Sequence, residues 1–186
     1  MTTIAALWVP ILLSAVLVFV VSSIIHMAVQ LHKGDYRGLP DEERAREALR
    51  SVPPGQYMVP HAASMKECGT PEMQQKFRDG PVGVLVMRPA GMPGMGPALG
   101  LWFAFCIVIG VFVAYLTGLA LAPGASYGQV FRIAATVAFL GHGFTSVNDS
   151  IWKGVSWGVT LKFVFDGALY ALVTAGTFAW LWPDAA

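Results

Sequence analysis

Charged side chains are scarce in this sequence, and their scarcity excludes an ordinary soluble domain. They make up 12% of the 186 residues, whereas soluble globular domains average about 25%. Hydrophobic residues reach 55%. The composition therefore indicates an integral membrane protein whose first partner is the lipid bilayer.

The sequence is also poor in cysteine and has no basic amino-terminal segment. Its two cysteines, Cys68 and Cys106, are too few for a disulfide framework, and we expect both to stay reduced. A secretory signal peptide carries Lys or Arg ahead of a short apolar run. Met1–Leu7 holds neither, and the apolar run continues to Val29. We therefore interpret the first hydrophobic segment as a retained membrane span.

Four stretches reach the length of about 18–20 apolar residues that a helix needs to cross hydrocarbon. They cover residues 4–29, 98–122, 128–148 and 157–182. Residues 31–97, between the first and second stretches, hold most of the charge. The sequence thus predicts an all-α membrane protein, a four-helix bundle with a small α/β insert between helices 1 and 2.

The distribution of Lys and Arg predicts the orientation of the spans. The insert carries nine of the 12, Lys153 lies on the same side, and Arg132 alone lies on the other side. Because cytoplasmic loops carry an excess of Lys and Arg, we expect a cytoplasmic insert and two periplasmic termini.

Turn and cap signals predict the elements of the insert. Pro40 followed by three acids is typical of a helix start, and that helix should reach Arg50. Residues 56–59 and 82–87 are β-prone and could pair. Thr70-Pro71-Glu72 should open a second helix that Gly80 ends. A unit of about 50 residues is marginally stable by itself, so we expect it to dock against the membrane helices or a partner.

No pattern in the insert defines a reaction centre, and we assign neither metal nor cofactor. Soft donors that could suit monovalent copper lie close together in the sequence, but methionines also fill gaps in small cores. His26 and His32, six residues apart, would lie on different faces of one helix. The basic residues alternate with acids, so nucleic-acid binding has no support. The weak metal candidates are Met58, His61, Met65 and Cys68, with Met73 nearby.

Small residues repeat every fourth position in two of the spans. Such ridges let helix backbones approach closely. They are typical both of packing within one chain, which we favour, and of a self-association face. The two ridges are Gly110, Ala114 and Gly118 in the second span, and Gly167, Ala171 and Ala175 in the fourth.

A polar cluster is predicted at one depth of the third and fourth spans. Lys162 and Asp166 lie one turn apart in an otherwise uncharged segment. At about 1.5 Å of rise per residue, they lie about 8 and 14 Å inside Trp157, and His142 lies about 10 Å from Asp149. We therefore expect His142, Lys162 and Asp166 to share one layer, with Asp149 nearer its edge.

Three interpretations of this cluster remain open. Lys162 can extend its stem toward the cytoplasm, whereas Asp166 needs Lys162, His142 or water as a partner. The cluster could fix helix register, or it could handle protons or ions, as buried Asp and His often do. A misplaced span boundary is the third interpretation.

Several motifs also resemble a known family. They include His32-Lys33-Gly34-Asp35-Tyr36, Pro54-Gly55-Gln56-Tyr57-Met58 and Asp149-Ser150-Ile151-Trp152-Lys153-Gly154. With these motifs the chain resembles an uncharacterised family of small four-pass bacterial membrane proteins. The resemblance implies a location in the bacterial inner membrane and supplies no catalytic residues.

These observations favour a non-catalytic component of a membrane assembly, either a homo-oligomer or an accessory subunit of a larger complex. The alternative is a small proton, ion or solute transporter or channel that uses the His, Lys and Asp cluster. An enzyme acting on a lipid or quinone is a third possibility, without residues that define its chemistry.

Overall fold

The computed structural model describes residues 2–92 and 94–185, and it confirms the predicted fold class. Four helical segments are long and apolar enough to cross a membrane. The first consists of a 3₁₀ turn (η1, Ile4–Leu7), α1 (Trp8–Ser23) and a π-helical turn (η2, Ile24–Val29). The others are α5 (Met95–Ala120), α6 (Tyr127–Gly143) continued by α7 (Val147–Lys153), and α8 (Trp157–Trp180).

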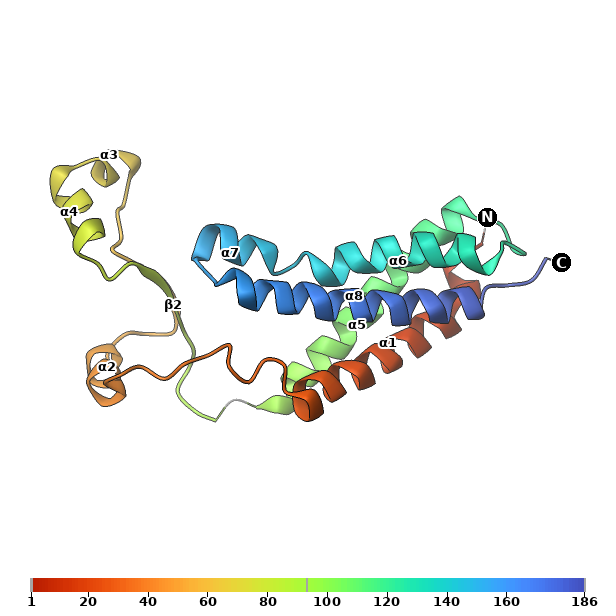
Figure 1. The fold of residues 1–186 in the computed structure, drawn as a ribbon, viewed down its shortest axis with the longest axis horizontal. Coiled ribbons are helices and arrows are strands. Elements are labelled where there is room, and N and C mark those ends of the chain that lie inside the picture. Colours follow the sequence, from red (N-terminus) through yellow and green to blue (C-terminus); the bar gives the residue numbers. More distant parts are fainter. Residues whose placement is uncertain (1, 93, 186) are drawn as a thin grey trace.

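The long helices form a closed bundle. α1 lies beside α5 and α8, and α6 also lies beside α5 and α8. Both chain ends lie at one end of the bundle and the insert extends from the other (Figure 1). We call these the terminal end and the insert end. The bundle therefore presents Asp166 of α8 to residues of the first segment as well as to α6.

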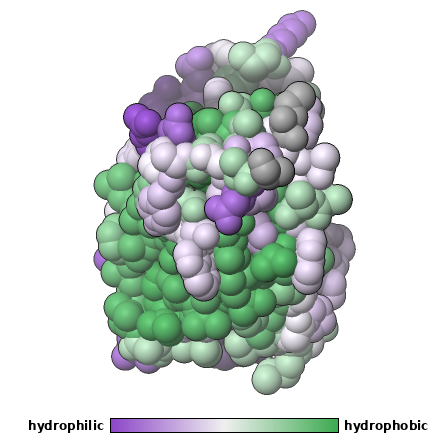
Figure 2. Space-filling model, turned by 90° about the vertical axis from the view of Figure 1, so that its right-hand side faces the viewer, coloured by the Kyte–Doolittle hydropathy of each residue, from purple (hydrophilic) through white to green (hydrophobic). Residues whose placement is uncertain are grey.

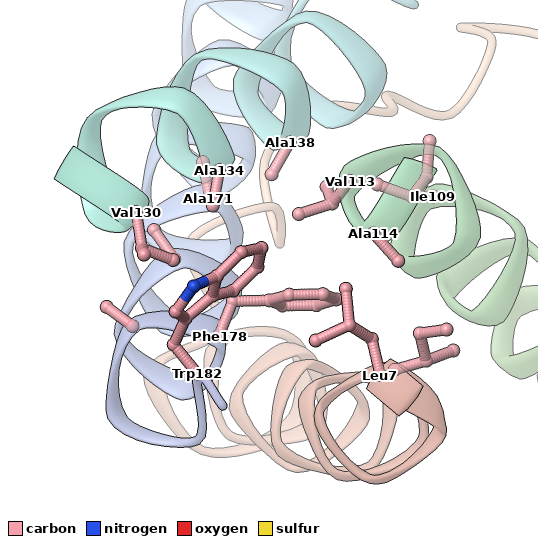
Figure 3. Close-up of a cluster of buried hydrophobic side chains, with 13 residues drawn as sticks. Leu7, Ile109, Val113, Ala114, Val130, Ala134, Ala138, Ala171, Phe178 and Trp182 are labelled. Atoms are coloured by element: carbon pink, nitrogen blue, oxygen red, sulfur yellow. The ribbon is translucent and has the colours of Figure 1, made fainter. Parts of the chain in front are cut away.

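Side chains from all four segments meet in a core near the terminal end. Figure 3 shows the Phe178 ring between Leu7 and Trp182, and all three side chains are buried. The Trp182 side chain turns inward, and its indole N–H donates to the Ala122 carbonyl oxygen at 3.0 Å.

The outside of the bundle is apolar, as contact with lipid requires. Figure 2 shows hydrophobic residues over much of the face seen from the terminal end. Large exposed hydrophobic side chains occur along every long helix; examples are Leu12, Val16, Phe112, Leu140, Leu161 and Leu172. This pattern agrees with four membrane-crossing helices.

Small residues allow the helices to approach closely inside the chain. A Cβ atom added at Gly167 would lie 2.4 Å from the Gly143 Cα, so α8 and α6 touch backbone to backbone. On α5, a Cβ added at Gly118 would meet the Thr2 carbonyl oxygen at 2.3 Å, and one added at Gly110 would meet Ile11 at 3.3 Å. Both predicted ridges thus lie against neighbours of the same chain.

The insert contains a two-stranded antiparallel sheet and three short helices. The strands β1 (Gly55–Val59) and β2 (Gly83–Met87) pair with Gly55 opposite Met87. The helices are α2 (Glu42–Leu49), α3 (Met65–Cys68) and α4 (Pro71–Asp79). Asp41 and Thr70 cap α2 and α4, and Gly80 ends α4.

Two details of the bundle and insert differ from the expectations. The third segment is not one continuous helix, because α6 ends at Gly143 and α7 begins at Val147. The folded part of the insert stands away from the bundle (Figure 1), and Met73 alone is buried among its described residues. The segment that does pack on the bundle is the one just after the first span, at His32 and Asp35.

Candidate functional site

A change of helix type at the end of the first span creates the site. His26 lies in the π-helical turn, and Gln30 ends that turn with a left-handed backbone, φ 55°. The chain then reverses through two tight turns, so that His32 returns toward α8. The rings of His26 and His32 stack with their centroids 4.7 Å apart. The expectation of opposite faces was wrong, because the helix does not continue as far as His32.

His32 joins two carboxylates through its two ring nitrogens. Its Nδ1 lies 2.6 Å from Asp35 Oδ2, and its Nε2 lies 2.8 Å from Asp166 Oδ2. Phe163 stacks on the ring at 4.5 Å between centroids. The imidazole is thus fixed in position between Phe163 and His26, with both nitrogens against oxygen atoms.

Lys162 pairs with Asp35 and not with Asp166, its neighbour on α8. Its ammonium Nζ lies 2.5 Å from Asp35 Oδ1, so its stem reaches toward the insert end. The Lys162 hydrogen bond lowers the pKa of Asp35 below its usual range, and the His32 contact acts in the same direction against burial. Asp35 is therefore an ionised acceptor for both neighbours.

A cavity of about 710 Å³ opens beside this network. Its walls come from the first span, α5, α6, α7 and α8, and they combine aromatic rings with polar groups. His142 lies in this wall with its ring against the edges of Trp102, Phe105 and Tyr170. His142 and Asp166 therefore line one cavity from α6 and α8, although the contact partner of Asp166 is His32.

Several buried polar atoms around the cavity lack a partner within the described residues. They are His142 Nδ1, Ser146 Oγ, Asp166 Oδ1 and Tyr170 Oη, and all four residues line the cavity. Buried polar groups are normally hydrogen-bonded. Four residues with unpartnered polar atoms therefore gather around one cavity.

Asp149, the fourth residue of the predicted cluster, lies at the rim of the same cavity. Its carboxylate forms an ion pair with Lys153 at 2.7 Å, and both side chains are about half exposed. Asp149 lies on α7, after the break that ends α6, and within the described residues it forms no hydrogen bond or ion pair with His32, Asp35 or Asp166. Asp149 therefore belongs to the cavity and not to the group around His32.

The sequence reasoning missed His26, His32 and Asp35 as partners of the intramembrane charges. Their signal was present in the His32–Tyr36 motif, which joins a histidine and an acid to the end of a span. A regular helix over the first span predicts no contact between its carboxyl end and α8, because that contact depends on the turn after Val29. The contact joins residues 134 positions apart.

The soft donors of the insert are distributed differently. Met73 is buried in α4, whereas Met58 and Met65 are exposed on β1 and α3. His61 follows β1, and Cys68 ends α3 half-buried. These positions agree with a methionine that fills a small core and others that face outward.

Fold and site together define a polytopic helical membrane protein with a buried His and carboxylate network beside a polar cavity. No protein-family model, no curated protein and no solved structure matches the chain. Any functional conclusion therefore depends on the residues of the site.

Proposed function

We propose that this protein moves a cation, the proton included, across or into the membrane by way of Asp166 and the adjacent cavity. The observation that carries the proposal is the placement of His32 between two carboxylates at 2.6 and 2.8 Å. Intramembrane ionisable residues of this kind mark ion and proton pathways.

Hydrogen-bond stoichiometry explains why this network suits a cation. A neutral imidazole carries one N–H. If Asp35, already paired with Lys162, accepts that hydrogen, the lone pair of His32 Nε2 faces Asp166 Oδ2 at 2.8 Å. Two acceptors at that distance repel each other unless a proton lies between them, carried either by an imidazolium or by the Asp166 carboxyl. The pair is therefore a place where a proton, the smallest cation, is bound.

Two neighbouring hollows that share His26 support access of a cation to the site. A second, more open hollow is lined by His26, Met27, Gln30, His32 and Lys33. The first cavity is lined by His26 and Asp166 and continues to His142 and Tyr170. The His26 side chain belongs to both hollows, and it is 43% exposed. His26 therefore lies between the more open hollow and the cavity that Asp166 lines, where a cation bound by Asp166 would meet it.

Flux through liposomes tests the proposal. Full-length protein is reconstituted, and proton and metal-cation uptake are followed with entrapped dyes. We expect Asp166→Asn to reduce uptake to the level of protein-free liposomes. Asp79→Asn, the same change in the exposed end of α4, should leave uptake intact. Wild-type uptake no faster than in protein-free liposomes, or uptake unchanged in Asp166→Asn, would refute the proposal.

The cell location follows from the charge distribution and the family resemblance. We place the protein in a bacterial inner membrane as a multi-pass protein, with a cytoplasmic insert and periplasmic termini. Nine basic residues in the insert against Arg132 at the terminal end support this orientation.

A second candidate is the non-catalytic component of a membrane assembly, and the insert favours it. The insert stands away from the bundle, and its strands and their flank expose Met58, Val82 and Val86. A partner protein or another copy of the chain would cover these side chains. In-membrane cross-linking between copies tests homo-oligomerisation, and Met58→Ser with Val86→Ser should abolish the cross-link. A monomer that co-purifies with no other protein would refute this candidate.

A further inference from the structure

We propose that His26, His32 and Asp166 together form a binding site for a divalent transition-metal ion of the Zn²⁺ type. The inference rests on the proposed function, because it names the class of cation that the same carboxylate would take. It adds His26, which takes no part in the bridge between the two carboxylates.

The positions of the donor atoms fit one small ion. One ligand atom from each residue lies within 4.8 Å of the other two. The Asp166 Oδ2 lies 2.8 Å from His32 Nε2 and 3.7 Å from His26 Nε2. Bonds of about 2.0–2.2 Å to a tetrahedral zinc place its ligand atoms roughly 3.4 Å apart. The two distances lie on either side of that value, so small side-chain movements suffice.

The surroundings of His32 are those of a metal ligand. Histidines that bind metals usually donate their other ring N–H to a carboxylate, which fixes the tautomer and the ring orientation. Asp35 supplies that carboxylate at Nδ1, and Lys162 in turn holds Asp35. When Nδ1 carries the hydrogen, the lone pair of Nε2 lies on the side of Asp166. Phe163 and His26 on the two faces of the ring limit its rotation.

Asp166 supplies an independent indication of a ligand. The residue is 1% exposed, and its Oδ1 has no hydrogen-bond partner among the described residues. Lys162 is neutralised by Asp35, so the Asp166 carboxylate is the remaining negative charge of the group. A divalent ion would compensate it at a depth where an isolated charge is costly.

The donor set selects the type of metal. Two imidazoles and one carboxylate suit zinc and its first-row neighbours, whereas magnesium and calcium prefer oxygen ligands. Three protein ligands leave a fourth position open, as in zinc sites that exchange water or substrate. Here the open position is at the cavity, where His26 and Asp166 line the wall. A site of this form can load and release its ion.

Cobalt binding to the full-length protein in detergent tests the inference. Co²⁺ absorbs visible light when four-coordinate, and Zn²⁺ is silent. We expect one Co²⁺ per chain, displaced by Zn²⁺, and a rise in melting temperature on adding Zn²⁺. His26→Ala should weaken Co²⁺ binding at least tenfold, since loss of a group that only orients a ligand already costs about 10–100-fold. His61→Ala, a histidine of the insert, should have no effect.

His26 makes this test independent of folding, because its side chain is 43% exposed and lies outside the His32 bridge. The melting temperature of His26→Ala without metal should stay close to that of the wild type, because the substitution removes only one partly exposed stacking contact with His32. Asp35→Asn gives a second check, with weaker Co²⁺ binding although Asp35 is not a ligand. Absence of saturable Co²⁺ absorption would overturn the inference, as would equal binding by His26→Ala and wild type.

The two proposals fail separately. Flux of protons or other cations that depends on Asp166 in buffer free of transition metals, together with no Co²⁺ binding, would retain the proposed function and reject the metal site. Stoichiometric Co²⁺ binding that needs His26, without flux of any cation, would retain the metal site and reject transport.

Discussion

Lys162 and Asp35 are separated by 127 residues, yet the lysine Nζ lies 2.5 Å from the aspartate Oδ1. The contact joins α8 to the segment that leaves the first span. It also leaves Asp166, one turn along α8, with His32 as its hydrogen-bond partner. The charge pair visible in the sequence is thus divided between two partners from the end of the first span.

We predict that the Lys162–Asp35 pair is strongly coupled in its effect on stability. Lys162→Met leaves the Asp35 carboxylate, 3% exposed in its side chain, without its cation. Breaking a buried pair costs more than removing both charges. The double variant Lys162→Met, Asp35→Asn should therefore melt at a higher temperature than Lys162→Met alone. Thermal unfolding of the wild type, Lys162→Met, Asp35→Asn and the double variant in one detergent measures the coupling. Additive decreases in melting temperature would contradict it.

The contact between α6 and α8 predicts that Gly167 tolerates no larger residue. A Cβ atom at Gly167 would meet the Gly143 Cα at 2.4 Å and the His142 carbonyl carbon at 2.8 Å. These are backbone atoms, which cannot avoid the clash by changing rotamer, so the helices would have to move apart. We therefore expect Gly167→Ala to destabilise the bundle by about 1–3 kcal/mol.

Gly100 of α5 provides the matched control for that change. A Cβ added there meets no atom of the described chain within 4 Å. Gly100→Ala should leave stability unchanged or raise it by up to about 1 kcal/mol. Denaturant titration in mixed micelles compares the two variants. Equal stability of both would mean that the helices are farther apart than described.

The two natural cysteines predict a one-sided labelling pattern. Cys68 is half-buried in the insert, whereas Cys106 is buried inside the bundle. A membrane-impermeant maleimide should label Cys68 in inside-out vesicles and leave intact spheroplasts unlabelled. Cys68→Ser should abolish the labelling. Reaction in spheroplasts alone would reverse the proposed orientation of the insert.

Much of the fold could be predicted because its signals are local. The spans follow from continuous apolar length, and the insert elements follow from caps such as Thr70 and Gly80. The predicted strands do pair, with Val59 opposite Gly83. The short helix α3 was missed, since its single turn depends on a cap at Ser64.

The site could be predicted only in part, because its contacts are long-range. Depth arithmetic on the third and fourth spans identified His142 and Asp166, and both line the cavity. It could not identify His32, because helical spacing applies only within one helix and the turn at Gln30 ends the first helix and reverses the chain. The two small-residue ridges likewise predicted that helices approach closely, but they could not predict which helix packs against each ridge.

The position of Asp35 has a mechanical consequence. Asp35 lies between the first span and the folded part of the insert, and Lys162 and His32 hold it against α8. Any force that pulls the insert away from the bundle must therefore break these contacts or displace α8 along with it. A partner that binds the insert and displaces Asp35 would also change the hydrogen bond between His32 and Asp166. The position of the insert is thus mechanically coupled to the buried Asp166 carboxylate through Asp35 and His32.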